Sequence, residues 1–203
     1  MKEMKVRITF TEEVLGTASG NSAIHEEFIA SKAPDAPSRE EEVEAIGVEA
    51  EVEKSKTVFP KDENGNPIFW DYQIKGFFKD SCSALKKATG YMSNKLTAHK
   101  KAIDGRVFVF PRQIPIMYDG AEIKDLIADC QRPLRAQTAQ GERVALANSE
   151  TVPAGSYIDI TIKCLEDGLT PYVEEWLDYG ELRGIGQWRN SGKGRFTWEY
   201  LED

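Results

Sequence analysis

A short segment near the carboxyl end of the chain combines four glycines with four cationic side chains. The glycines are Gly184, Gly186, Gly192 and Gly194, and the cations in or beside the segment are Arg183, Arg189, Lys193 and Arg195. Glycine has no Cβ, so the backbone amides of such a loop can approach a phosphate closely. Cations neutralise phosphate charge, and Trp188 in the middle could stack on a base. These residue types predict a phosphate-binding loop.

Two common phosphate motifs are excluded for this segment. The Gly-Lys-Ser/Thr ending of a Walker A loop is absent, and the segment does not follow a strand and open a helix as a dinucleotide loop does. An alternative interpretation remains, in which the segment is a tight connection between a helix and a strand. The glycines would then serve chain geometry alone.

The charge of the chain is unevenly distributed. The net charge is −8, which argues against a protein that coats nucleic acid generically. Residues 72–112, however, hold nine Lys or Arg residues against Asp80 and Asp104, a net charge of +7. A local basic surface on an acidic protein can hold a polyanion, although a solvated helix face would have the same composition.

Few residues could carry catalysis. His99, beside Lys100 and Tyr91, is the catalytic candidate, and the alternative is a surface histidine. No His, Cys or Asp cluster has metal-ligand spacing, so we expect neither a metal nor another cofactor. Three separated cysteines and the lack of a secretory or membrane-spanning segment favour a cytoplasmic protein without membrane association.

The elements that would position the loop follow from hydrophobic periodicity. Two-residue alternation predicts strands over residues 5–10, 106–110, 113–117, 157–164 and 195–201. Three- and four-residue spacing predicts helices over 74–89, with Lys75 and Lys79 on or beside its polar face, and over 170–180. Thr170 would be the N-cap of the second helix, and Trp176 would lie on its apolar stripe.

Two long segments interrupt this pattern, and we interpret them as insertions at about 16–60 and 119–149. Without them, the order of elements is strand, helix, strands, helix, strand. That order is typical of a ferredoxin-like (RRM-like) α+β fold with an antiparallel sheet and two helices on one face. We expect one domain over residues 1–203, with the loop near Lys75 and Lys79 at the start of the first helix.

Three segments, in the same order, resemble the RAMP superfamily of CRISPR backbone subunits and crRNA-processing endonucleases. The glycine-rich loop lies after the last helix and before the last strand, as in that superfamily. Residues 73–80, QIKGFFKD, resemble the start of the first helix in backbone subunits. Residues 149–158, SETVPAGSYI, are similar to the superfamily's Glu-x-Val-Pro-x-Gly entry to a strand.

The resemblance implies a non-catalytic module that binds single-stranded nucleic acid, usually RNA, and assembles along its strand with copies of itself or with CRISPR effector subunits. Its binding residues would be those of the loop together with Lys75 and Lys79. Two alternatives remain. One is a metal-independent RAMP endoribonuclease that uses His99. The other is a phage or mobile-element protein that interacts with a CRISPR effector through its acidic insertion.

Overall fold

The computed structural model of the chain describes residues 1–19, 56–138 and 141–202. The chain divides into two compact units. The main unit comprises Met1–Val14, Pro60–Ile127 and Val152–Asp203, and the second unit comprises Leu15–Phe59 and Ala128–Thr151. The glycine-rich loop and both predicted helices belong to the main unit. Residues 20–55 of the first predicted insertion lie outside the described residues.

An antiparallel sheet is the base of the main unit. Its four longer strands are β1 (Lys2–Phe10), β6 (Val107–Phe110), β12 (Tyr157–Cys164) and β13 (Phe196–Tyr200). They lie in the order β13, β1, β12, β6, and every neighbouring pair is antiparallel. The short strands β8 (Met117–Tyr118) and β9 (Ala121–Glu122) extend the sheet beyond β12. The sheet therefore has six strands rather than the predicted four.

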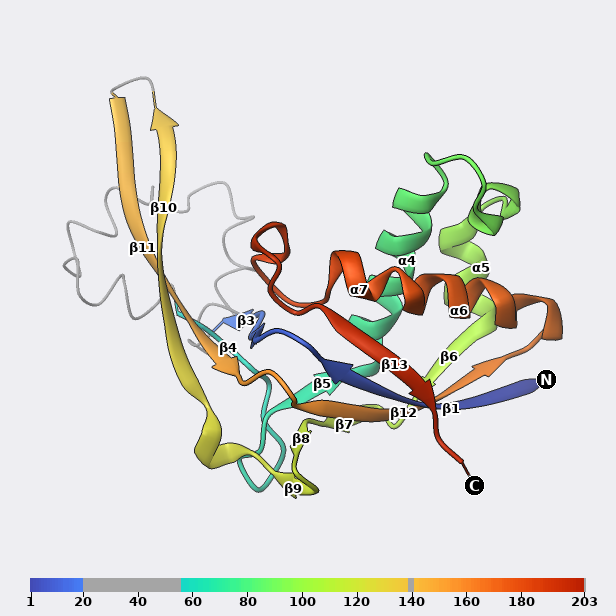
Figure 1. Ribbon diagram of the computed structural model, residues 1–203, viewed down its shortest axis with the longest axis horizontal. Helices are drawn as coiled ribbons and strands as arrows, with labels where there is room; N and C mark the ends of the chain where they lie inside the picture. Colours follow the sequence, from blue (N-terminus) through green and yellow to red (C-terminus); the bar gives the residue numbers. More distant parts are fainter. Residues whose placement is uncertain (20–55, 139–140, 203) are drawn as a thin grey trace, which may run out of the picture. The chain divides into compact units, whose positions relative to one another are not determined.

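Helices cover one face of this sheet. Figure 1 shows α4 (Asp71–Leu85), α5 (His99–Arg106), α6 (Thr170–Asp178) and α7 (Gly180–Arg183) on the same side of β1, β12 and β13. Burial alternates along β12, where Ile158, Ile160, Ile162 and Cys164 are buried and the intervening residues are partly exposed. One face of each strand therefore packs on the helices, as two-residue periodicity requires. The structure confirms an α+β fold with an antiparallel sheet.

The helix boundaries differ from the prediction at both helices. The first helix begins at Asp71 and ends at Leu85. It begins earlier than predicted because the side chain of Gln73 accepts a hydrogen bond from the Trp70 amide at 2.7 Å, which caps the first turn of the helix. Thr170 is the first residue of α6 and not its N-cap, which is Leu169. Helix α5 was not predicted, because its eight residues bury only Ala102 and Ile103.

Short elements connect the larger ones in the main unit. The strands β5 (Ile68–Trp70) and β7 (Gln113–Pro115) pair with each other at the start of α4. Four single turns of 3-10 helix complete the described connections: η1 (Met92–Lys95), η2 (Lys124–Leu126), η3 (Asp167–Leu169) and η4 (Arg189–Ser191). No helix among the described residues has the length and apolar character needed to cross a membrane.

A long antiparallel hairpin forms most of the described part of the second unit. Its strands are β10 (Ala128–Thr138) and β11 (Gly141–Val152), and Figure 1 shows them paired along their length. Strand β4 (Thr57–Val58) pairs in parallel with β11 and antiparallel with β3 (Ala18–Ser19). The two-residue strand β2 (Val14–Leu15) precedes β3. The second predicted insertion thus contains regular strands, which the sequence pattern did not indicate.

Trp176 anchors the packing of α6 in the main unit. Its side chain is fully buried, and its ring lies 5.7 Å from that of Phe78 on α4, measured between centroids. The indole Nε1–H donates to Ser93 Oγ at 3.0 Å, so the polar atom of the ring is satisfied. Glu175 in turn accepts hydrogen bonds from the backbone amides of Met92 and Ser93. The predicted apolar stripe of this helix is confirmed at Trp176.

We expect Trp176→Ala to lower the free energy of unfolding by about 3–5 kcal/mol, because the change leaves a large cavity between α4 and α6. Urea unfolding of the variant and the wild type measures this difference. Leu182→Ala is the control, because Leu182 is 66% exposed on α7 and should change stability by no more than about 0.5 kcal/mol. Equal losses in the two variants would contradict the packing described here.

Candidate functional site

The glycine-rich loop connects α7 to β13 and depends on left-handed backbone conformations. The φ angles are +69° at Gly184, +87° at Gly186, +91° at Gly192 and +72° at Gly194. Trp188, which has a Cβ, also has a positive φ of +54°. Side chains disfavour this region, so the glycines are needed for the course of the chain. The loop is closed at its base by a hydrogen bond from the Ile185 amide to the Gly194 carbonyl at 2.9 Å.

Two of these glycines also permit close backbone approach. A Cβ at Gly194 would lie 1.8 Å from the carbonyl oxygen of Ile185, and a Cβ at Gly184 would lie 2.6 Å from the carbonyl carbon of Gly194. At Gly192 the nearest atom would be 3.7 Å away. Gly184 and Gly194 therefore allow the two ends of the loop to touch, as the geometric interpretation of the loop requires.

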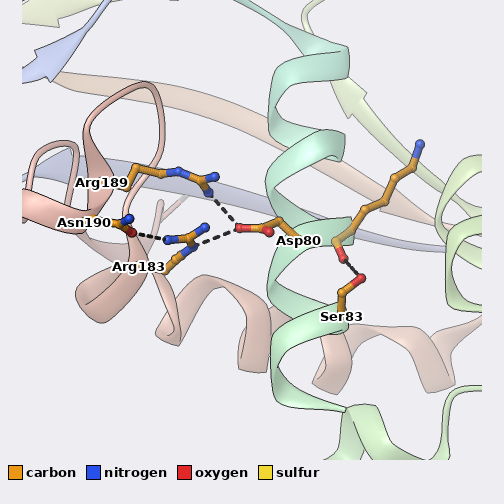
Figure 2. Close-up of polar contacts among 6 residues, drawn as sticks. Asp80, Ser83, Arg183, Arg189 and Asn190 are labelled. Carbon is orange, nitrogen blue, oxygen red and sulfur yellow. Dashed lines mark hydrogen bonds and ion pairs between the residues drawn. The ribbon is translucent and has the colours of Figure 1, made fainter. Parts of the chain in front are cut away.

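Two arginines of the site converge on one carboxylate. Arg183 Nε donates to Asp80 Oδ2 at 3.0 Å, and Arg189 Nη1 donates to the same oxygen at 2.7 Å. Figure 2 shows both guanidinium groups directed at Asp80, which projects from α4, while Asn190 accepts a hydrogen bond from Arg183. Each arginine is roughly one quarter to one third exposed. We call Asp80, Arg183, Arg189 and Asn190 the arginine cluster.

The electrostatics of the arginine cluster favour an ionised Asp80. Partial burial would raise the pKa of this carboxyl, but the hydrogen bonds and charges of Arg183 and Arg189 outweigh burial and hold the pKa below its ordinary value. The two guanidiniums and one carboxylate leave a net positive charge. A guanidinium has five N–H groups, and the contacts with Asp80 and Asn190 engage only part of them. The arginine cluster therefore has the positive charge and the N–H groups that a further anion would need.

The remaining cations and the tryptophan of the loop lie in different settings. Lys193 Nζ contacts Glu13 Oε2 at 2.9 Å, and the Gly194 amide donates to the Glu13 carbonyl. Arg195 is exposed immediately before β13. Trp188 is 40% exposed, and its carbonyl accepts hydrogen bonds from the amide and hydroxyl of Ser191. The loop thus exposes the indole of Trp188 and the guanidinium of Arg195 to solvent, while Lys193 and Glu13 form an ion pair where the loop meets the rest of the main unit.

Lys75 and Lys79 do not contact the arginine cluster. Lys79 forms an ion pair with Asp104 of α5, and Lys75 Nζ donates to the Asp104 carbonyl at 3.1 Å. Burial lowers the pKa of Lys75. Successive helix positions point in different directions, so Lys79 faces α5 while the neighbouring Asp80 faces the loop. Lys75 and Lys79 thus contact α5, on another side of α4 than Asp80, and their role in one binding surface with the loop stays a prediction.

His99 lies at the start of α5, half-buried, with its Nε2 atom 2.9 Å from Ser83 Oγ. Burial lowers its pKa, and the charges of Lys86 and Lys100 lower it further, so these surroundings favour the neutral ring. Ser83 donates its hydroxyl hydrogen to the Lys79 carbonyl, which makes Nε2–H of His99 the donor to Ser83 Oγ. Among the described residues, no three His, Cys, Asp or Glu side chains are grouped as metal ligands.

Sequence reasoning missed the partners of the predicted cations. Asp80 was counted only as a charge within the basic segment, and Glu13 was not considered. Asp80 and Arg183 are separated by 103 positions in the chain, so no spacing pattern could link them. The only signal was that a carboxylate interrupts a lysine-rich helix, which does not identify the partner that it faces.

We expect Gly194→Ala to destabilise the protein more than Gly192→Ala. Both changes place a side chain at positive φ, at a cost of about 1–2 kcal/mol. Gly194→Ala also forces a Cβ against the Ile185 carbonyl, which should cost about 1–3 kcal/mol more. Urea unfolding of the two variants checks the difference, and equal stabilities would show that the loop does not close through Gly194.

Asp80→Asn should lower the free energy of unfolding at pH 7 by about 1 kcal/mol, because it removes a partly exposed carboxylate from two guanidiniums. The folded-state pKa of Asp80 lies below its ordinary value of 3.8, so this contribution is present above that pH and is lost as the pH falls through the folded-state pKa. Unfolding curves at pH 7 and near pH 2 should therefore show the difference from wild type shrinking in acid. Asp125→Asn, which removes a carboxylate at an exposed position in η2, is the control and should leave the stability at pH 7 close to that of wild type.

Comparisons with known proteins show where this fold occurs. No protein-family model and no curated protein matches the chain. Its structure is similar to a chain in the cryo-EM structure of the type III-B Cmr-beta bound to cognate target RNA, with a TM-score of 0.55 and 12% identity over 99% of this chain. A chain of a type IV-B CRISPR complex has a TM-score of 0.49 and 11% identity, and the match covers 98% of this chain and 90% of that one. This chain spans 60% of the length of the type III-B neighbour, with which it shares a fold.

Proposed function

We propose that the chain is a RAMP-like module that binds single-stranded RNA without cleaving it. The observation that carries this proposal is the arginine cluster, in which Arg183 and Arg189 meet one carboxylate oxygen at 3.0 and 2.7 Å. A carboxylate oxygen and a phosphate oxygen are bound by guanidinium in the same way. The loop therefore holds two anion-binding groups in place, with N–H donors left for a phosphate.

The course of the main sheet supports the same assignment at the level of fold. Strands β1, β6, β12 and β13 are the first to fourth long strands of the main unit, and their spatial order is fourth, first, third, second. Helix α4 lies between the first two in sequence, and α6 lies between the last two. This is the order of a ferredoxin-like fold. We propose one RAMP-like domain over residues 1–203, with insertions at about 16–60 and 119–149.

RNA is the polymer that we assign, because the type III-B structural neighbour was determined with RNA bound. The proposed binding residues are the loop positions Arg183, Gly184, Gly186, Trp188, Arg189, Gly192, Lys193, Gly194 and Arg195. Phosphates would contact the arginines and Lys193, and Trp188 would stack on a base. The proposed setting is the cytoplasm, where the module would assemble with subunits of a CRISPR-type effector or with copies of itself.

A metal-independent endoribonuclease is the second candidate. The observation in its favour is the position of His99, whose Nε2 atom contacts Ser83 and whose pKa is lowered by burial and by the charges of Lys86 and Lys100. A neutral imidazole can accept a proton from a ribose hydroxyl, and nearby ammonium groups can stabilise the charge that develops. Cleavage of a labelled RNA hairpin in EDTA that disappears in His99→Ala would favour this candidate over a non-catalytic module.

We expect the wild-type protein to bind a single-stranded RNA oligonucleotide with an affinity that falls steeply with salt. Arg189→Ala combined with Lys193→Ala should reduce the slope of log K against log salt by roughly 0.7 for each phosphate that the variant no longer neutralises. Trp188→Ala should instead cost about 1–3 kcal/mol with little change in slope, because stacking is not ionic. Fluorescence anisotropy at several salt concentrations measures both quantities.

The matched control is Lys87→Ala combined with Lys124→Ala, which removes the same charge from two exposed positions outside the loop. It should leave the salt slope close to that of wild type. Absence of RNA binding by the wild type at low salt would overturn the proposed function and leave the glycine-rich loop as a structural connection.

A further inference from the structure

Four aromatic rings of the main unit each lie against a cationic side chain. Lys75 Nζ lies 5.1 Å from the ring centroid of Phe108, and Lys163 Nζ lies 5.5 Å from that of Phe110. The guanidinium carbon of Arg112 lies 5.9 Å from the Trp70 ring. The fourth pair, Arg7 over Tyr157 at 4.1 Å, lies farther along β12, and its arginine is bound to Asp159. The aromatic residues of the first three pairs lie in β6 and at the end of β5.

Phe108 and Phe110 point to the face of the sheet opposite the helices, and Lys75 of α4 reaches the Phe108 ring because β6 pairs only with β12 among the described strands and forms an edge of the sheet. In β6 the residues alternate, with Val107 and Val109 buried and Phe108 and Phe110 exposed by 37% and 47%. Their neighbours across the sheet are Lys163 and Thr161 of β12. Two large aromatic side chains at successive outward positions expose more apolar surface than polar residues would expose there. An exposed apolar patch commonly marks a binding surface.

The surface continues from the end of β6 toward the start of α4. Arg112 follows Phe110 by two residues, and its carbonyl accepts a hydrogen bond from the Asp71 amide at 3.0 Å. Trp70, against Arg112, stacks with Tyr72, which is 61% exposed, at a ring separation of 6.3 Å and an interplanar angle of 11°. Ring–cation pairs thus occur in β6, at Arg112 and at the start of α4, and none of their residues belongs to the glycine-rich loop.

We propose that this surface, comprising Phe108, Phe110, Trp70, Lys75, Lys163 and Arg112, is a stacking platform for the bases of a single-stranded nucleic acid. The inference rests on the proposed function and adds a second contact region to it. Bases stack on aromatic rings, and the cations beside the rings meet the phosphates that link those bases. A protein partner would fit the exposed rings but would not require a cation beside each one.

The spacing favours a single strand over a duplex. Phe108 and Phe110 are two positions apart on one strand, so their rings are separated by about 7 Å. Successive nucleotides in a helical strand rise by only about 3.4 Å. The two rings therefore match bases that are unstacked from each other, as in an extended single strand. Lys75, Lys163 and Arg112 supply positive charge beside the rings, and Glu3 reduces it through its ion pair with Lys163 at 3.0 Å.

The test uses the full chain and three probes: a 12-nucleotide single-stranded oligoadenylate RNA, the corresponding RNA duplex, and inorganic polyphosphate. Phe108→Ala combined with Phe110→Ala should weaken binding of the single strand by about fivefold to a hundredfold for each base that no longer stacks. The salt slope should be unchanged, and so should binding of the duplex and of polyphosphate. Phe110→Leu keeps an apolar side chain but removes the ring, so it should weaken binding of the single strand and leave binding of the other two probes unchanged. Phe110→Trp should retain binding of the single strand.

Tyr91→Ala is the matched control, because Tyr91 is an exposed aromatic residue (42%) outside the platform. If the Phe108 and Phe110 variants bind oligoadenylate as tightly as wild type while Arg189→Ala with Lys193→Ala does not, the platform is overturned and the proposed loop function stands. If instead the Phe108 and Phe110 variants lose binding and the Arg189 and Lys193 variant does not, the platform is supported and the proposed function of the loop is overturned. If the platform variants change only the molar mass of the protein in light scattering, the surface is a protein contact and the inference is wrong.

Discussion

The contact of Asp80 with Arg183 and Arg189 holds the candidate site together. It joins the middle of α4 to the end of α7 and to the loop beyond, and it is the point at which the loop is tied to the helical layer. A loop with five positive φ angles between Gly184 and Gly194 has little intrinsic order. The ion pairs, together with the contact of Lys193 with Glu13, give it one arrangement. The same carboxylate limits how strongly the loop can attract a polyanion, because it cancels one of the two guanidinium charges.

Packing within the helical layer, rather than charge, fixes the positions from which Asp80 and Arg183 meet. Trp176 and Phe78 hold α6 against α4, and Phe196 packs edge-on against Phe77 at a ring separation of 5.2 Å. A Cβ at Gly180 would lie 2.1 Å from the Phe196 ring, so the first residue of α7 lies directly on the last strand. Arg183 therefore leaves α7 at a position fixed by buried aromatic rings. The glycine-rich loop starts from that fixed point, which explains how an exposed loop can hold two guanidiniums on one oxygen.

Hydrophobic periodicity predicted strands and helices well where one face of the element is buried and the other is exposed. Residues 157–164 alternate strictly, and β12 has those bounds; the stripe around Trp176 likewise placed α6. The hairpin of β10 and β11 was missed, because alanine, arginine, glutamine and proline in residues 128–138 do not alternate by hydropathy. In the candidate site, the loop residues were identified from their types. The partners of these residues were not identified, because Asp80 and Arg189 are 109 positions apart in the sequence. The sequence also does not show that Lys75 and Lys79 on the same helix contact Asp104 instead of the loop.

The central place of β1 has a consequence for synthesis of the chain. Arg7 of β1 meets Asp159 of β12, 152 residues later, and β13 comes later still. At ribosomal rates of about 5–20 residues per second, β1 waits roughly 8–30 s for its neighbours. During that time the backbone of β1 has neither of its partner strands, and Met4, Val6, Ile8 and Phe10, all buried in the finished fold, lack the completed core. The nascent chain should therefore benefit from chaperones that shield this apolar segment. A chain released from the ribosome before residue 157 would lack both neighbours of β1.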